Sequence, residues 1–278
     1  MKTRTNQSFL ISIFFLIVSS WIYPIGSFFN TKETTTKDPI EKRYNKEQIK
    51  NRQRIAHWIK HGVTFLALEN ISIGADVEIG AGTSIANGVH ILSGSRIGKN
   101  CNIQNSCIID NTTLEDNVTI HPLCVVRNSH ISKQSQIGPF AHVHSGTKIG
   151  SKTTIGNFVE VKKSQLGEKT KAKHLSYLGD ATIGSQVNIG AGTITCNYNG
   201  FTKHQTTIED NAFIGSNNTI IAPVTIEKSA FTAAGSTITK DVPSCSLAIG
   251  RARQINKDNY TKKLVEKCSP RPNTDNKD

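Results

Sequence analysis

Residues 71–110 read ISIGADVEIGAGTSIANGVHILSGSRIGKNCNIQNSCIID, and this stretch decides the fold of the chain. Isoleucine recurs at every sixth position from Ile73 to Ile109 without a miss. A strand alternates with a period of two residues and an α-helix with a period of about 3.6, so a period of six fits neither as one long element. It fits a series of short strands that each turn a corner at the same point, as in the hexapeptide repeats of parallel β-helices.

The rhythm returns after each interruption further along the chain. The later aliphatic positions are Ile137, Val143, Ile149, Ile155, Val161, Ile183, Ile189, Ile208, Ile214, Ile220, Ile226 and Ile238. We expect these residues to point inward and to stack on their equivalents one coil away. A small residue four places on is also expected inside, as at Val77, Thr83, Val89, Ser95, Cys101 and Cys107. Glycine often follows the aliphatic residue, which suits a corner that needs positive φ or close backbone approach.

Composition and charge exclude one class of partner. Aromatic residues make up only 6% of the chain, which suits a solenoid whose coils pack on one another. The net charge is +12, but residues 64–250 contain 14 Lys and Arg against 13 Asp and Glu. The positive excess therefore lies at the two ends. A nucleic-acid-binding domain would place basic and aromatic residues on its folded body, so no nucleic-acid partner is expected.

The six cysteines do not indicate disulfides or zinc. Cys101, Cys107 and Cys124 each lie four residues after an aliphatic position of the repeat, so we expect them to be small buried hydrophobes. The sequence has no CxxC or Cys/His ligand spacing, and no metal site is predicted.

The two ends differ from the repeat. Residues 1–30 contain the apolar run FLISIFFLIVSSWIY (9–23), which is typical of a leader or signal-anchor, and residues 9–29 could attach the chain to a membrane. Residues 31–45 are expected to be a linker and residues 46–62 a helix that Gly62 ends. Residues 63–250 form the predicted β-helix. Residues 251–278 are basic and predicted to be disordered.

Two stretches break the aliphatic rhythm. They are KKSQLGEKTKAKHLSYLGD (162–180) and TCNYNGFTKHQTT (195–207). Solenoids expel insertions as loops on one face, which is often the binding face. Both stretches are therefore predicted to be loops, and the first contains His174, whose side-chain type suits a general base near neutral pH. A loop histidine that is merely solvated remains the alternative.

The same stretches resemble one family. GNFVEVKK (156–163), KAKHLSYLGDATIGSQVNIGAGTITCNYNG (171–200), AFIGSN (212–217), APVTI (222–226) and AAGSTITKDV (233–242) are similar to the acetyltransferase half of the bacterial bifunctional enzyme that makes UDP-N-acetylglucosamine. The resemblance covers roughly residues 46–256. It implies an all-β, left-handed parallel β-helix, a homotrimer with active sites between subunits, and acetyl transfer from acetyl-CoA to glucosamine 1-phosphate.

The resemblance also assigns roles to single residues. His174 matches the general base that takes a proton from the sugar amine. Positions that hold the sugar phosphate correspond to Lys162, Tyr177, Asn188 and His144, with Lys203 as a loop lysine that reaches a neighbouring subunit's site. Positions at the acetyl-CoA site correspond to Ala191, Asn197, Tyr198, Ser216, Ala234 and Arg251.

This chain departs from the family at two points. The family has an arginine where His144 stands. Histidine is mostly neutral at pH 7 and cannot grip phosphate as a permanent bidentate cation, so weaker phosphate binding or a changed acceptor is expected. The family's nucleotidyltransferase domain precedes its β-helix, whereas a hydrophobic stretch and a short linker stand there in this sequence. No uridylyl transfer is therefore expected.

Three other readings remain open on sequence grounds. The chain could act on another amino sugar, or it could be a non-catalytic trimeric scaffold. A trimeric β-helix carbonic anhydrase would need three histidines in metal geometry, and His142 and His144 are expected to point to opposite faces of their strand. The alternatives for location are a membrane-anchored chain with a cytosolic catalytic domain and a chain addressed to an organelle by a cleaved leader, because acetyl-CoA is found on those sides of the membrane.

Overall fold

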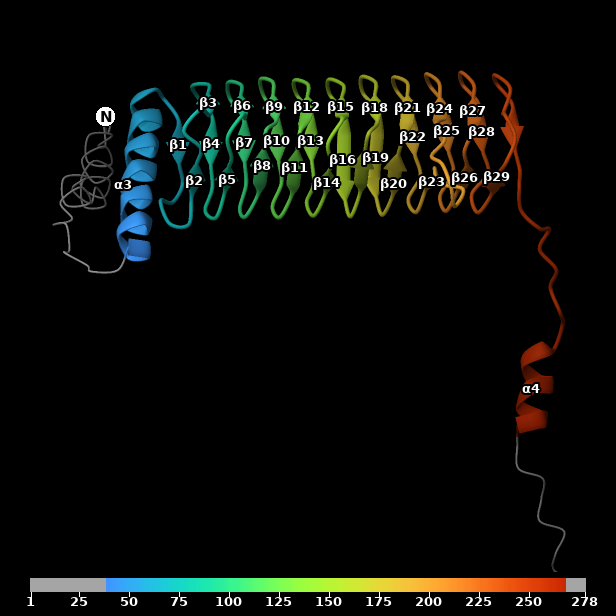
Figure 1. Cartoon of the computed structure of the whole chain (residues 1–278). Coiled ribbons are helices and arrows are strands. Elements are labelled where there is room, and N and C mark those ends of the chain that lie inside the picture. Colours follow the sequence, from blue (N-terminus) through green and yellow to red (C-terminus); the bar gives the residue numbers. More distant parts are fainter. Residues whose placement is uncertain (1–38, 269–278) are drawn as a thin grey trace, which may run out of the picture. The chain divides into compact units, whose positions relative to one another are not determined.

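The computed structural model describes residues 39–268, so the predicted leader lies outside the described residues. The chain divides into two units, residues 1–50 and 51–278, and helix α3 (Pro39–Lys60) runs across the division. The second unit is a parallel β-solenoid with three sheets, and each coil contributes one short strand to each sheet (Figure 1). It has the left-handed β-helix fold that the resemblance implies. Within residues 39–268 no helix has both the length and the apolar character needed to cross a bilayer.

Sheet A contains eleven strands. They are β1 (Thr64–Phe65), β4 (Ser84–Ile85), β7 (Asn102–Ile103), β10 (Thr119–Ile120), β13 (Gln136–Ile137), β16 (Thr154–Asn157), β19 (Lys171–His174), β22 (Asn188–Ile189), β25 (Phe213–Ile214), β28 (Phe231–Thr232) and β30 (Leu247–Ala248).

Sheet B contains ten strands. They are β2 (Ser72–Ile73), β5 (His90–Ile91), β8 (Ile108–Asp110), β11 (Val125–Arg127), β14 (His142–Val143), β17 (Glu160–Lys162), β20 (Tyr177–Gly179), β23 (Ile194–Cys196), β26 (Thr219–Ile221) and β29 (Thr237–Ile238).

Sheet C contains nine strands. They are β3 (Glu78–Ile79), β6 (Arg96–Ile97), β9 (Thr113–Leu114), β12 (Ser129–Ile131), β15 (Thr147–Ile149), β18 (Gln165–Leu166), β21 (Ala181–Ile183), β24 (Thr206–Ile208) and β27 (Val224–Ile226).

The core consists of the aliphatic positions of the repeat, stacked coil upon coil. Ile73 pairs with Ile91 and Ile91 with Ile109, and all three side chains are fully buried. The small residues four places on are buried as well, including Cys101, Cys107 and the equivalent Cys124. Both expectations about the interior are confirmed. Burying each such aliphatic side chain contributes about 1.5–3 kcal/mol relative to leaving it exposed.

Glycine has two separate roles at the corners. The glycines that follow an aliphatic residue allow close approach, because a Cβ built on Gly80 would lie 2.6 Å from the carbonyl carbon of Gly98 on the next coil. Positive φ falls mostly elsewhere, for example at Gly88 (φ 70°) and Ser106 (φ 57°), and among the glycines that follow a buried isoleucine Gly138 (φ 98°) is the exception. Close approach, rather than a left-handed backbone, is therefore the reason for the other Ile-Gly pairs.

The number of residues per coil shows that only one of the two predicted loops is an insertion. Val143, Val161 and Leu178 are successive partners in sheet B, so the usual coil length is kept across 162–180. The prediction of a loop at 162–180 is wrong: Leu166, Ala172 and Leu178 occupy the buried hexad positions there, and the coil continues with other apolar side chains in place of isoleucine. Thr195 pairs with Ile220, which makes this coil longer than its neighbours. The second predicted loop is therefore confirmed and lies between Cys196 and Thr206.

Both flanks of the solenoid are more helical than expected. Helix α3 begins at Pro39, so residues 39–45 belong to it and not to the predicted linker. Proline at the first helical position fits, because its missing N–H would have no partner there. Helix α4 (Tyr260–Cys268) lies in the segment predicted to be disordered. Asn51 of α3 binds the first coil, since its Nδ2 donates to the Ile71 carbonyl oxygen (2.6 Å) and its Oδ1 accepts from the Ile73 N–H (2.9 Å).

Candidate functional site

Two columns of side chains cover the outer face of sheet B in the middle of the solenoid. Because residues two apart on a strand share a face, each strand adds one residue to each column. His142, Glu160 and Tyr177 pair in sequence along the first column. Arg127, His144 and Lys162 follow the paired residues Val126, Val143 and Val161, so they lie on successive coils in the second column. Neighbouring strands are about 4.8 Å apart, so these groups form one continuous polar surface.

His142 and His144 lie on the same face of β14 and its continuation, and the expectation that they point to opposite faces is wrong. Their ring centroids are 3.6 Å apart and the rings are stacked. The physical reason is the period of two, since only one residue, Val143, separates them. Among residues 39–268, no group of three or more His, Cys, Asp or Glu side chains is arranged to hold a metal ion.

His144 is engaged on two sides. Its Nε2 lies 2.8 Å from Glu160 Oε1, although the approach does not have the geometry of a hydrogen bond. Its side chain is only 26% exposed.

The pKa of the neighbouring His142 is lowered below its usual 6.5, first by burial and then by the nearby His144. The lowered pKa favours the neutral form of His142 at pH 7.

His174 lies in a strand and not in a loop. It ends β19, and its Nδ1 is 2.8 Å from Oδ1 of Asn157, its partner one coil earlier on β16. A carbonyl oxygen can only accept, so Nδ1 carries the proton and the neutral ring keeps a lone pair on Nε2. The side chain is exposed, so this Nε2 is open to an incoming molecule. Sequence reasoning missed Asn157, although it precedes His174 by one coil and the coil length could have found it.

A second cluster joins the start of the inserted loop to sheet B. Asn197 is buried, and its Nδ2 donates to Asp180 Oδ2 (2.5 Å) and to the Tyr177 hydroxyl oxygen (3.4 Å). The Tyr177 ring lies against Gly179, where a Cβ would overlap it, so the glycine allows this position of the tyrosine side chain. Asp180 was not predicted as a site residue; its carboxylate fixes the Asn197 amide and hence the direction of Tyr177.

The inserted loop is tied together internally. Tyr198 and Lys203 form an antiparallel bridge, and the Tyr198 hydroxyl donates to the Gly200 carbonyl oxygen. The Asn199 side-chain oxygen accepts from the backbone N–H groups of Phe201 and Thr202. The loop therefore presents Phe201, which is 91% exposed, on a defined turn.

Three of the six residues expected at the acetyl-CoA site are stacked in one corner column. Asn217 N–H donates to the Ala191 carbonyl oxygen (2.7 Å), and Gly235 N–H donates to the Ser216 carbonyl oxygen (2.8 Å). Ala191, Ser216 and Ala234 thus occupy the same corner on successive coils. Arg251 belongs to the next coil, and its Cδ lies 3.8 Å from a Cβ built on Gly235.

Asn188 lies apart from the residues with which it was grouped. It is on β22 of sheet A, paired with Lys171 and Phe213, whereas Lys162 and Tyr177 are on sheet B. A single chain therefore does not bring the predicted phosphate-binding residues together on one face.

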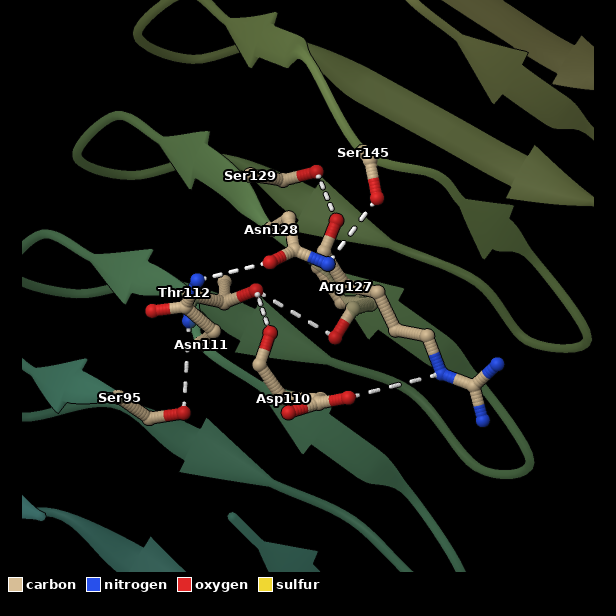
Figure 2. A network of polar contacts seen from close by, with 9 residues as sticks. Ser95, Asp110, Asn111, Thr112, Arg127, Asn128, Ser129 and Ser145 are labelled. Atoms are coloured by element: carbon tan, nitrogen blue, oxygen red, sulfur yellow. Dashed lines mark hydrogen bonds and ion pairs between the residues drawn. The ribbon is translucent and has the colours of Figure 1, made fainter. Parts of the chain in front are cut away.

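A polar network adjoins the second column at the corner between sheets B and C (Figure 2). Asn111 Nδ2 donates to Asn128 Oδ1 (2.7 Å), and Asn128 Nδ2 donates to Ser145 Oγ (3.0 Å). Figure 2 shows Arg127 extending beside this network, with its Nε 3.9 Å from Asp110 Oδ2. Arg127, like Asn157 and Asp180, was missed by sequence reasoning.

Family models match two separate parts of the chain. The GMPPB C-terminal domain matches residues 67–152, and the hexapeptide repeat of succinyl-transferase matches residues 205–240. The bifunctional protein GlmU of Thermosipho melanesiensis is 64% identical over 132 residues, which are 48% of this chain and 29% of that protein. GlmU of Shouchella clausii is 55% identical over 137 residues, 49% of this chain and 30% of that protein. The C-terminal half of this chain is homologous to GlmU.

The matched part is a minor share of GlmU, because the chain spans less than a third of the length of these relatives. Solved structures are more distant. LpxA from Acinetobacter baumannii is 19% identical with a TM-score of 0.39, covering 65% of this chain and 71% of that chain. The UDP-N-acetylglucosamine acyltransferase of Francisella novicida is 20% identical with a TM-score of 0.31, covering 65% and 66%. At such TM-scores they support no statement about the site.

Proposed function

We propose that this protein is an acetyl-CoA-dependent N-acetyltransferase that acts on glucosamine 1-phosphate. The observation that carries the proposal is His174, whose Nδ1 is bonded to Asn157 while Nε2 stays open, in a segment homologous to GlmU. A scaffold of this fold has no need for an exposed histidine held in one tautomer. The cluster of Tyr177, Asp180 and Asn197 supports the same reading, because it places hydrogen-bonding groups beside the loop.

The chemistry assigned to His174 follows from its ring. An ammonium has no lone pair, so the sugar amine must lose a proton to attack the thioester carbon. The amine therefore attacks in its neutral form, after its ammonium proton has passed to solvent, and Nε2 of His174 takes a second proton from the nitrogen as the new C–N bond forms. The C–S bond then breaks, and the protonated His174 returns this proton to the departing CoA thiolate, which leaves as the thiol. Backbone or side-chain donors facing the carbonyl oxygen would stabilise the negative charge that develops on it.

The acetyl donor and the phosphate are assigned to different surfaces. We assign acetyl-CoA to Ala191, Ser216, Ala234 and Arg251, with Asn197 and Tyr198 nearer the reacting thioester. Small residues in a corner column leave room for a long ligand to lie along the solenoid. We assign the sugar phosphate to Lys162, Tyr177 and Asn188, with His144 and Lys203 beside them.

We also propose that three copies of the chain assemble. Four consecutive coils place a large apolar residue at the corner between sheets A and B: Leu123, Phe140, Phe158 and Leu175, here called the apolar ridge. Each has φ between 48° and 62° and is between 47% and 61% exposed. A left-handed backbone costs such residues about 1–2 kcal/mol each, which contact with another copy would offset. Assembly would also bring Asn188 and Lys203 of one copy toward residues of another.

The proposal is tested by following free CoA thiol. The full chain is incubated with acetyl-CoA and glucosamine 1-phosphate, beside His174→Ala and the matched control His90→Ala on the exposed outer face of β5. Thiol release that needs the sugar phosphate and falls about 10²–10⁴-fold in His174→Ala alone is expected, because a positioned general base contributes that much.

Other outcomes would change the proposal. Release with a different amino sugar in place of glucosamine 1-phosphate would favour the alternative acceptor, which the histidine at position 144 suggests. No release with any amino sugar, or equal rates in wild type and His174→Ala, would contradict the enzymatic function.

A further inference from the structure

Helix α3 carries a large excess of positive charge. Its 22 residues contain seven Lys and Arg against two Glu, whereas residues 64–250 contain 14 Lys and Arg against 13 Asp and Glu. The proposed acetyl transfer assigns no role to any residue of this helix. The charge of α3 is therefore not explained by the proposed site.

Four of these cations lie on one exposed face of the helix. Lys42, Lys46 and Lys50 follow one another at intervals of four residues, which brings their side chains to the same side of the helix. Arg43 lies beside them, and all four residues are exposed. Ile49, which is 39% exposed, comes two turns after Lys42 and adjoins the same face. The four cations are here called the basic face.

The opposite side of α3 makes the contacts with the solenoid. Ile55 is buried, and Asn51 bonds to the backbone of the first coil. At about 3.6 residues per turn, the nine residues from Lys46 to Ile55 make two and a half turns, so these two side chains point in opposite directions from the helix axis. The basic face therefore takes no part in holding the helix to the first coil.

The chemistry of the basic face fits the surface of an anionic lipid bilayer. Clusters of four to eight Lys and Arg on a helix, or next to an apolar membrane segment, bind anionic headgroups, and an adjoining apolar side chain can enter the headgroup region. Single-stranded nucleic acid is bound with aromatic side chains on which the bases stack. Tyr44 and Trp58 are each seven residues from Asn51, so they lie on its side of α3 and not on the basic face.

The chain before α3 contains a segment of matching character. The sequence has the apolar run at residues 9–23, and the 15 residues from 24 to 38 separate this run from α3. A segment of this length spans at most about 50 Å when fully extended. If the run enters a bilayer, as the sequence predicts, it keeps the basic face within that distance of the headgroups and so raises their effective concentration.

We infer that the basic face of α3 binds the surface of an anionic lipid bilayer. The inference does not depend on the proposed acetyl transfer and goes beyond it. It gives the two sides of one helix separate roles: Asn51 and Ile55 join α3 to the solenoid, and the four cations join it to lipid.

The test is hydrogen–deuterium exchange of the full chain in the presence of vesicles. Vesicles of phosphatidylcholine alone are compared with vesicles of an equal mixture of phosphatidylcholine and phosphatidylserine. Backbone amide exchange in residues 39–50 should slow at least about threefold with the mixed vesicles relative to phosphatidylcholine alone, because binding opposes opening of the helix. High salt should remove this difference by screening. The apolar run can enter both kinds of vesicle, so the difference reports on the basic face.

Two variants with the same change in net charge make the test specific. One combines Lys42→Gln, Arg43→Gln, Lys46→Gln and Lys50→Gln, which keeps residues that favour a helix. This variant should lose the difference between the vesicles, because each cation close to an anionic surface strengthens binding about fivefold. The matched control replaces four exposed lysines of the solenoid by glutamine and should behave as wild type; they are Lys99, Lys133, Lys148 and Lys240.

Four results would overturn the inference. Exchange in residues 39–50 that is equal with the two kinds of vesicle would contradict it, as would a difference that persists in the helix variant. Loss of the difference to the same extent in the solenoid control would show a general effect of net charge. Slowing by poly(U) RNA without slowing by the mixed vesicles would identify nucleic acid as the partner instead.

Discussion

The coils of residues 71–122 and the coils of residues 123–221 have the same interior and different exteriors. Ile109 of the first group and Ile155 of the second are both fully buried. The outer surfaces differ: Gly88 and Ser106 occupy the left-handed corner in the first group, whereas the apolar ridge occupies it in the first four coils of the second, before Gly192 and Asn217. Only the second group contains the stacked histidines and the inserted loop. The buried aliphatic side chains therefore stabilise the fold in both groups of coils, whereas the exposed columns can differ and can carry functional groups.

The largest expected effect tests whether the two interiors are equivalent. Ile109→Ala and Ile155→Ala should each lower the free energy of unfolding by about 2–5 kcal/mol, because each deletes buried methyl groups and leaves a cavity. Urea denaturation of both variants measures this. A much smaller loss at Ile155 would break the comparison, since it would mean that the coils around the site are more loosely packed.

The next effect concerns the apolar ridge. Phe158→Asn should convert a trimer to single chains, because asparagine accepts the left-handed backbone but removes apolar contact area. Light scattering coupled to gel filtration measures the mass. Ser106→Asn, at the same corner in the first group of coils, is the matched control and should leave the mass unchanged. A wild-type chain that is already monomeric would contradict the proposed assembly.

The smallest effect is the pH dependence of stability at the histidine pair. The pKa of His142 is lowered in the folded chain, chiefly by burial, so the unfolded chain takes up the proton first as the pH falls. The stabilising contribution is therefore complete above pH 6.5 and is lost as the pH falls from 6.5 through the folded-state pKa. His142→Asn should weaken the fall in melting temperature between pH 7.5 and pH 5. His90→Asn, in the same outer column of sheet B, is the control, and an equal change in both variants would contradict the assignment.

Much of the fold follows from the hexad rhythm alone. Isoleucine at every sixth position predicts the strands, the buried column and the burial of Cys101, Cys107 and Cys124. The error at 162–180 arose because Leu166 and Ala172 were not counted as members of the rhythm. The side chain at a buried hexad position can change without any change in coil length. A real insertion, as between Cys196 and Thr206, is distinguished by the number of residues it adds.

The site was less predictable, because its contacts join residues on different coils. Asn157, Asp180 and Arg127 have no local motif of their own and acquire their neighbours only when the coils are stacked. The nearly constant coil length, applied as a register to the sequence, would have placed Asn157 beside His174. It would not have shown that His144 faces Glu160, since that depends on side-chain torsions.

The side chain of Asn51 has a consequence for behaviour in concentrated solution. The first strand of a sheet in a parallel solenoid has unpaired backbone N–H and C=O groups along its outer edge. These groups could pair with a strand of another chain and so begin a fibre. Asn51 occupies the Ile71 carbonyl oxygen and the Ile73 N–H with a single amide, as a neighbouring strand would. We therefore expect Asn51 to oppose the end-to-end joining of chains at the first strand of sheet B. The solenoid can then contain many stacked coils without polymerising from this strand.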